Sequence, residues 1–137
     1  MNIKAHGVDI VETARLQEAI DRHGQAFLDR VFTPDELAYC IGKKREIEHL
    51  AGRFAAKEAV LKVLGTGWTN GIAWTDVEVL RDDDGAPSIR LQGRCREIAD
   101  GQGLQKILVS LSHTESMAMA SAIGVIESCG GALGIGD

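Results

Sequence analysis

We expect the chain to be organised around the segment Leu50-Ala51-Gly52-Arg53-Phe54-Ala55-Ala56-Lys57-Glu58-Ala59-Val60-Leu61-Lys62-Val63-Leu64-Gly65-Thr66-Gly67. Its alanine, leucine, lysine and glutamate residues favour helix, and no proline interrupts them. Gly65 stands where a helix commonly ends. At 100° per residue the apolar side chains form one stripe, which we expect to be buried. The segment therefore predicts a central helix with its buried side made by Leu50, Phe54, Leu61 and Leu64.

The charged residues of this helix form two pairs, each spaced one turn apart: Arg53 with Lys57, and Glu58 with Lys62. Small alanine side chains stand beside the second pair and leave room for a ligand. On spacing alone, a solvated face is the simpler interpretation, because such pairs are common and contribute only a few tenths of a kcal/mol. The helix by itself does not decide between a ligand site and a solvated surface.

The composition fits a single globular domain. The chain has 137 residues, of which 45% are hydrophobic and 26% are charged, and its net charge of -5 disfavours bulk nucleic-acid binding. We find neither an apolar run of membrane-spanning length nor a signal-peptide layout, so we expect no membrane partner and a cytoplasmic location. Three scattered cysteines, Cys40, Cys95 and Cys129, match no metal-ligand spacing. We expect reduced thiols that pack as small hydrophobes.

The segment Ile3 to Val11 is rich in β-branched residues and predicts a strand, with Gly7 as a break in the run. Asp9 lies inside this strand, between Val8 and Ile10. Aspartate is depleted in strands, and departures from local propensity concentrate at functional sites. A solvent-facing edge position, or a cap for the following helix, explains Asp9 equally well at this point.

Two short helices are predicted next, over Thr13 to His23 and Ala26 to Phe32. Thr33-Pro34-Asp35-Glu36 then has the pattern of a helix start, with Thr33 as N-cap and Glu36 completing a capping box. The run Lys43-Lys44-Arg45 precedes the central helix. These cations suit a phosphate, although three cations at a helix junction are usually solvated.

The second half of the chain predicts mostly strands. Trp74 to Leu80 and Ser88 to Leu91 alternate in strand fashion around a turn at Asp82 to Pro87, so we expect a hairpin. The three consecutive aspartates of this turn lack the later glutamate of a calcium loop, which disfavours a metal there. We expect a helix over Arg94 to Asp100.

Two strands are predicted after that helix, over Ile107 to Leu111 and Met117 to Ile126, joined by a turn at Ser112 to Ser116. The second run is also compatible with a helix, and its length and position favour the strand. His113 in the turn is a candidate base, phosphate ligand or plain polar residue. We assign one domain to residues 1–127 and expect the glycine-rich tail, residues 128–137, to be disordered.

Four blocks carry a family resemblance through their order and spacing. They are Gly7-Val8-Asp9-Ile10-Val11-Glu12, Phe32-Thr33-Pro34-Asp35-Glu36-Leu37, Arg53-Phe54-Ala55-Ala56-Lys57-Glu58-Ala59 followed by Gly65-Thr66-Gly67, and Leu111-Ser112-His113. Together they resemble the 4′-phosphopantetheinyl transferases, over about Ile3 to Glu127. The resemblance implies an α/β (α+β) fold in which a small antiparallel sheet packs on a long central helix. It also implies a homotrimer with active sites at the subunit interfaces.

The activity that the resemblance implies is transfer of 4′-phosphopantetheine from coenzyme A to a serine of apo acyl-carrier protein, in fatty acid biosynthesis. The other product is adenosine 3′,5′-bisphosphate. In the family, the positions that match Asp9 and Glu58 bind Mg²⁺ together with the coenzyme A pyrophosphate, which suits an ion that prefers one or two carboxylates plus phosphates. The catalytic set implied is Asp9, Glu58, Lys62 and His113. For the base that activates the serine we favour Glu58, with a metal-bound water oriented by Asp35 as the alternative.

The resemblance also implies contact residues. The positions expected to bind coenzyme A are Lys44, Arg45, Arg53, Lys57, Lys62, Gly65, Thr66, Gly67, Gly85, Pro87, Ser112, His113 and Thr114. Acyl-carrier proteins are acidic, and this chain is itself net negative, so docking needs a local basic patch. Arg15 and Arg22 of the first helix are the candidates. A coenzyme A or nucleotide-binding module without catalysis is the competing reading, and it would not need Asp9 and Glu58 together.

Overall fold

The computed structural model describes residues 1–69 and 71–127. Two parts of the chain lie outside the described residues: Asn70, and the tail of residues 128–137, which includes Cys129 and for which the sequence predicts disorder. The elements follow in the order β1 (Asn2–Glu12), α1 (Thr13–His23), α2 (Gln25–Val31), α3 (Pro34–Cys40), α4 (Glu46–Leu64), η1 (Trp74–Asp76), β2 (Val77–Arg81), β3 (Pro87–Leu91), α5 (Gly93–Gly101), β4 (Leu104–His113) and β5 (Met117–Ile126). None of the helices in these ranges combines the length and apolar character needed to cross a bilayer.

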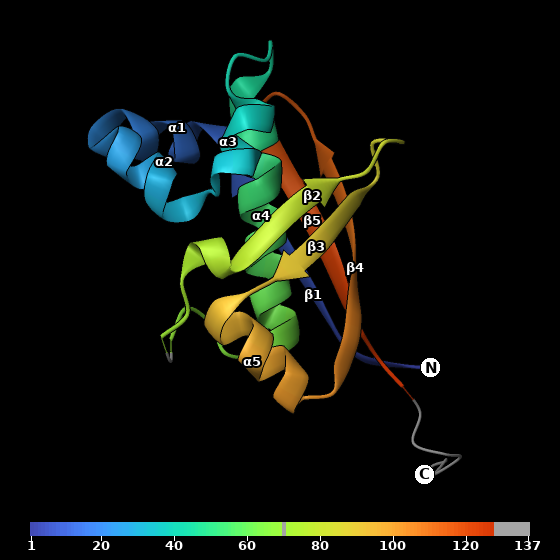
Figure 1. Ribbon diagram of the computed structural model, residues 1–137. Coiled ribbons are helices and arrows are strands. Elements are labelled where there is room, and N and C mark those ends of the chain that lie inside the picture. The colour runs from blue at the N-terminus through green and yellow to red at the C-terminus, as the bar shows by residue number, and fades with distance from the viewer. Residues whose placement is uncertain (70, 128–137) are drawn as a thin grey trace.

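The central helix α4 confirms the prediction and begins four residues earlier than Leu50. It ends at Gly65, which has a left-handed backbone with φ 77° and donates its N–H to the Leu61 carbonyl. Thirteen of its 19 residues are buried, because the sheet packs on one side and the β2–β3 hairpin crosses the other (Figure 1). The predicted apolar stripe is fully buried at Leu50, Leu61 and Leu64, and Phe54 is partly buried.

Strands β1, β5 and β4 form an antiparallel sheet in that order, and α4 packs against one face of it. The expectation that Gly7 breaks the first strand is wrong, since Gly7 pairs with Ala122 inside β1. A Cβ at Gly7 would lie 2.1 Å from the Ala59 carbonyl oxygen of α4. Gly7 therefore lets the strand and the helix approach closely, and this contact sets the distance between Asp9 and the helix.

The chain contains a second, two-stranded sheet made by β2 and β3, where the sequence predicted a hairpin. Its turn is built by Asp82, whose Oδ1 accepts the backbone N–H groups of Asp84 and Ala86. The strand is shorter than predicted, because Trp74–Asp76 forms a 3₁₀ turn before β2 begins at Val77. The Asp76 carboxylate stabilises this turn by accepting the Ala73 N–H.

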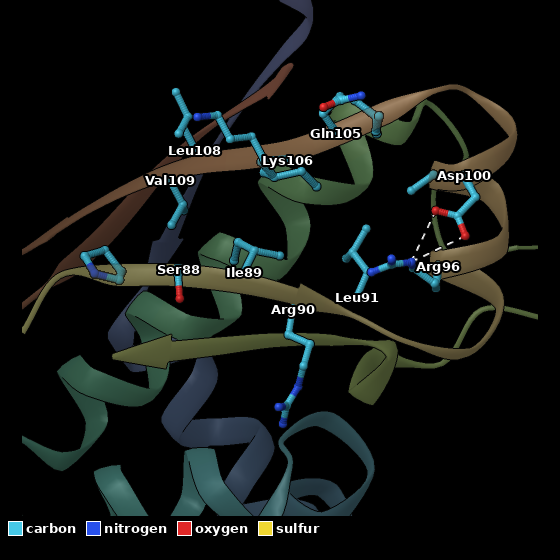
Figure 2. Close-up of a pocket in the computed structure, with 14 residues that line it drawn as sticks. Ser88, Ile89, Arg90, Leu91, Arg96, Asp100, Gln105, Lys106, Leu108 and Val109 are labelled. Carbon is cyan, nitrogen blue, oxygen red and sulfur yellow. Dashed lines mark hydrogen bonds and ion pairs between the residues drawn. The ribbon is translucent and has the colours of Figure 1, made fainter. Parts of the chain in front are cut away.

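A groove of about 510 Å³ separates the edge strand β3 from the edge strand β4. Figure 2 shows Ile89 and Leu91 pointing from β3 toward β4, and Val109 pointing back. At the end of the groove Arg96 pairs with Asp100 within α5 at 3.2 Å. The two sheets therefore meet through side chains instead of forming one continuous sheet.

The remaining elements agree with the sequence in most respects. Thr33 caps α3 in a capping box with Glu36. The segment Met117 to Ile126 is a strand, as its length and position predict. The prediction of Ser112 and His113 in the turn is wrong, because both belong to β4 and pair with Met119 and Ala118. The turn covers only the next three residues, 114–116.

Candidate active site

Asp9 and Glu58 line one cavity of about 420 Å³, although 49 positions separate them in the chain. The alternation of β1 turns Asp9 toward α4, and Glu58 lies on the side of α4 next to that strand. Phe54, Glu12 and Arg15 also line the cavity. The structure thus brings together the two carboxylates that the sequence predicted to act as a pair.

Each of these carboxylates uses one oxygen in a contact with the protein. Asp9 Oδ1 lies 3.3 Å from Lys62 Nζ, which also donates to the Val8 carbonyl at 2.8 Å. Glu58 Oε1 accepts the indole N–H of Trp68 at 3.1 Å. Within the described ranges, the other oxygens, Asp9 Oδ2 and Glu58 Oε2, accept no hydrogen bond. Two oxygens thus stay available for a ligand.

The donor set suits a small, hard cation that shares its coordination with a substrate. Residues 1–69 and 71–127 contain no group of three or more His, Cys, Asp or Glu side chains arranged to hold a metal. Mg²⁺ is usually bound by one or two carboxylates together with phosphates and water, so two carboxylates fit that ion without a third protein ligand.

Trp68 is a site residue that the sequence did not predict. Its ring stacks on Trp74 with centroids 3.7 Å apart, and Trp74 stacks on Phe54 at 4.7 Å. This stack fixes the indole that holds Glu58. One sign of this role was present in the sequence, an aromatic residue directly after Gly65-Thr66-Gly67. Its partner Glu58 is ten residues away, and no helical or strand period links Trp68 to Glu58.

Lys57 does not lie where a phosphate could reach it, contrary to the contact set implied by the resemblance. Its side chain is 0% exposed, and Nζ contacts Glu36 Oε1 at 2.9 Å and the carbonyls of Trp74 and Val77. These three acceptors use all three ammonium donors. Burial lowers the pKa of Lys57, and the Glu36 carboxylate opposes that shift. Lys57 therefore ties α4 to α3 and to the hairpin.

Arg53 is also buried, with 2% exposure. Its guanidinium lies over the Tyr39 ring at 4.2 Å, and Nη1 donates to the His49 carbonyl at 3.2 Å. Nε is buried and has no partner among the described residues. The nearby charge of Arg53 adds to the effect of burial in lowering the pKa of His49.

The other residues expected at the site lie in separate places within one chain. Ser112, His113 and Thr114 line a cavity of about 200 Å³, and His113 Nδ1 lies 2.8 Å from Glu48 Oε1. A neighbouring cavity of about 640 Å³ is lined by Lys44, Arg45 and Glu48. None of these residues lines the cavity of Asp9 and Glu58.

The two glycine-containing segments also lie apart. Gly65, Thr66 and Gly67 follow the C-terminal end of α4, whereas Gly85 and Pro87 belong to the β2–β3 turn. Figure 1 places that turn and the end of α4 at opposite ends of the molecule. The predicted contact residues are thus divided over one subunit and do not form a single site within it.

Comparison with known proteins agrees with the motifs. The family model described as the 4′-phosphopantetheinyl transferase superfamily matches residues 5–119. A holo-[acyl-carrier-protein] synthase of Geotalea daltonii is 48% identical over 117 residues, covering 85% of this chain and 94% of that protein. The corresponding protein of Koribacter versatilis is 44% identical over 117 residues, with the same coverage.

Solved structures give the same result. The crystal structure of holo-[acyl-carrier-protein] synthase from Neisseria meningitidis superposes with a TM-score of 0.83 at 30% identity, covering 90% of this chain and 99% of that one. The Helicobacter pylori holo-[acyl-carrier-protein] synthase, crystallised in complex with coenzyme A, gives a TM-score of 0.78 at 30% identity, with coverage of 88% and 100%. From these matches and the four motif blocks, the chain belongs to the 4′-phosphopantetheinyl transferase superfamily.

Proposed function

We propose that this protein transfers 4′-phosphopantetheine from coenzyme A to a serine of apo acyl-carrier protein, for fatty acid biosynthesis. The observation that carries the proposal is the shared cavity of Asp9 and Glu58, each with one oxygen available. Relatives that are 42–48% identical are named holo-[acyl-carrier-protein] synthases, and a structural neighbour binds coenzyme A. The competing module that binds coenzyme A without catalysis gives no reason for two carboxylates in one cavity.

In this proposal Asp9 and Glu58 would hold Mg²⁺ through the carboxylate oxygens that have no partner among the described residues. When bound, the ion neutralises charge on the pyrophosphate and makes the attacked phosphorus more electrophilic. The cation of Lys62 lies beside Asp9 and serves the departing bisphosphate, whose negative charge grows as the bond breaks.

The reaction exchanges one phosphorus–oxygen bond for another. The serine oxygen of the carrier forms a bond to the phosphorus that bears pantetheine, and the bond from that phosphorus to the bridging oxygen breaks. The bridging oxygen leaves with adenosine 3′,5′-bisphosphate, and the serine proton passes to Glu58. Catalysis of this kind depends mainly on positioning and charge neutralisation.

The division of the contact residues supports a homotrimer with active sites between subunits. In one chain His113, Lys44 and Arg45 do not line the cavity of Asp9 and Glu58, which is compatible with a site completed by a second copy. Among the described residues, the face of the three-stranded sheet opposite α4 exposes the hydrophobic side chains of Val8, Ile10, Leu108, Met117 and Met119. Light scattering tests this assembly, and Ile10→Glu should shift a trimeric mass toward the monomer.

The carrier is expected to dock near Arg15 and Arg22 of α1. Arg15 lines the cavity of Asp9 and Glu58, and its side chain is 81% exposed. We place the reaction in the cytoplasm, because the two cysteines in the described ranges are buried free thiols.

Mass spectrometry tests the activity directly. Apo acyl-carrier protein incubated with the protein, coenzyme A and Mg²⁺ should gain the mass of one phosphopantetheine. A chelator should prevent the gain, and added Mg²⁺ should restore it. A protein that binds coenzyme A and leaves the carrier unmodified under these conditions is the non-catalytic module.

A further inference from the structure

A buried carboxylate holds the ring of His113. Glu48 is 7% exposed, and its Oε1 lies 2.8 Å from His113 Nδ1 across 65 positions of sequence. A carboxylate can only accept a hydrogen bond, so this contact assigns the proton to Nδ1. The other ring nitrogen, Nε2, is left for a different partner.

The second nitrogen, Nε2, has no hydrogen-bond partner among the described residues. His113 lines the cavity of Ser112 and Thr114, and Glu48 lines the adjoining cavity of Lys44 and Arg45. The pair therefore joins the two groups of residues that we expect to contact phosphates. The ring of His49 meets His113 edge-on at 5.5 Å and restricts its rotation.

Glu48 is placed so that its charge can be kept in this buried position. It lies in the first turn of α4, where the helix dipole favours an anion. A buried carboxylate is costly unless it accepts hydrogen bonds, and His113 supplies one. Burial lowers the pKa of the neighbouring His49, and the charges of Arg53 and His113 act in the same direction.

We propose that Glu48 is a positioning residue, which holds His113 through Nδ1–H so that Nε2 is presented to a phosphate of coenzyme A. In the doubly protonated ring, Nε2–H is the donor to a phosphate oxygen, while Nδ1–H stays on Glu48. The proposal rests on the proposed function for the identity of the ligand. The proposal adds a residue to the site, because neither the catalytic set nor the motif blocks of the family resemblance include Glu48.

The proton position can be measured without any activity assay. Long-range ¹H–¹⁵N correlation spectra of the neutral rings distinguish the two tautomers, and His113→Asn assigns the signals. We expect His113 to carry its proton on Nδ1 in the wild type. Glu48→Ala should remove this preference, and Glu48→Gln should retain it, because the amide oxygen can still accept the N–H.

Ligand binding tests the consequence of that position. Binding of adenosine 3′,5′-bisphosphate, measured by calorimetry, should weaken about tenfold in Glu48→Ala and less in Glu48→Gln. In a His113→Asn background, Glu48→Ala should change the affinity by less than about twofold, because coupled residues are not additive. The matched control is Glu97→Gln on α5, whose exposed carboxylate pairs with Arg94 and lines none of these cavities.

The outcomes separate this proposal from the proposed function. If wild-type protein binds the bisphosphate but modifies no carrier, the proposed function fails and the Glu48 assignment stands. An unchanged tautomer with unchanged affinity in a folded Glu48→Ala variant overturns the positioning role. An equal loss in the wild-type and His113→Asn backgrounds also overturns it, since Glu48 would then act independently of His113. A wild-type protein that binds neither coenzyme A nor the bisphosphate overturns both proposals.

Discussion

Lys57 Nζ lies 2.9 Å from Glu36 Oε1, and both side chains are 0% exposed. Glu36 also accepts the backbone N–H groups of Thr33 and Val79, so one carboxylate joins the start of α3, the hairpin and the central helix. The lysine of the Phe54-Ala55-Ala56-Lys57-Glu58 block therefore supports the scaffold on which Glu58 stands.

Replacing Lys57 should cost stability. Lys57→Met leaves the Glu36 charge buried without its partner, and we expect the free energy of unfolding to fall by about 3–5 kcal/mol. Urea unfolding followed by circular dichroism measures this change. The exposed Lys62→Met is the control, with an expected loss below about 1 kcal/mol. Wild-type stability combined with lost coenzyme A binding in Lys57→Met would instead indicate a phosphate contact.

Glu58→Gln should reduce phosphopantetheine transfer by about a hundredfold or more while leaving the fold intact. The amide oxygen can still accept the Trp68 N–H, so the packing around position 58 is kept, but the charge and the basic oxygen are lost. Transfer rates and a thermal melt of the same sample separate the two effects. Full activity would remove Glu58 from the mechanism.

Gly7→Ala should destabilise the protein by about 3 kcal/mol or more, because the new Cβ meets the Ala59 carbonyl oxygen at 2.1 Å. The strand would have to move away from α4, which separates Asp9 from Glu58, so transfer should also fall. Gly101→Ala is the control, because a Cβ there meets nothing within 4 Å. Equal melting temperatures for the two variants would contradict the close packing of β1 on α4.

Docking of the carrier should depend on ionic strength. Arg15 and Arg22 are exposed on α1 of a chain with net charge -5, so attraction to an acidic carrier has to be local. Arg15→Glu should lower kcat/KM about tenfold at low salt, and less at high salt where charges are screened. A rate that is indifferent to salt in the wild type would point to apolar docking.

The two buried thiols should lower the free energy of unfolding at alkaline pH. Burial raises the pKa of Cys40 from 9.0 to about 11 and that of Cys95 to about 12. The unfolded thiols lose their protons first, so this contribution is complete below pH 9.0 and is lost as the pH rises toward those values. Denaturant titrations below and above pH 9.0 should show the decline. A double Cys40→Ala, Cys95→Ala variant should show a weaker pH dependence, and an identical slope would contradict the assignment.

Local features of the fold could be predicted because they depend on neighbouring residues. Thr33 and Glu36 form their capping box within one turn, and Gly65 ends α4 through its own backbone. The strand around Asp9 follows from its β-branched composition, and the length and position of the run from Met117 to Ile126 favoured a strand over a helix. Asp9 also stood out by itself, since an aspartate inside a strand opposes local propensity.

Contacts between distant segments could not be predicted in this way. Helical periodicity placed Lys57 on a charged face, and only the packing of α3 and the hairpin against that face buries it. Gly7 looked like a strand break because the close approach of Ala59, 52 positions later, leaves no local trace. The pairing of His113 with Glu48 likewise joins β4 to the start of α4.

The sequence by itself therefore determined the helices, the strands and the chemical types of the candidate site residues, since backbone preference and hydrophobic period act over a few residues. The tertiary structure decided which charged side chains are buried, which carboxylates share a cavity and which contact residues lie apart in one subunit. Burial and proximity depend on what packs against a residue from elsewhere in the chain, and that is settled only when the whole core forms.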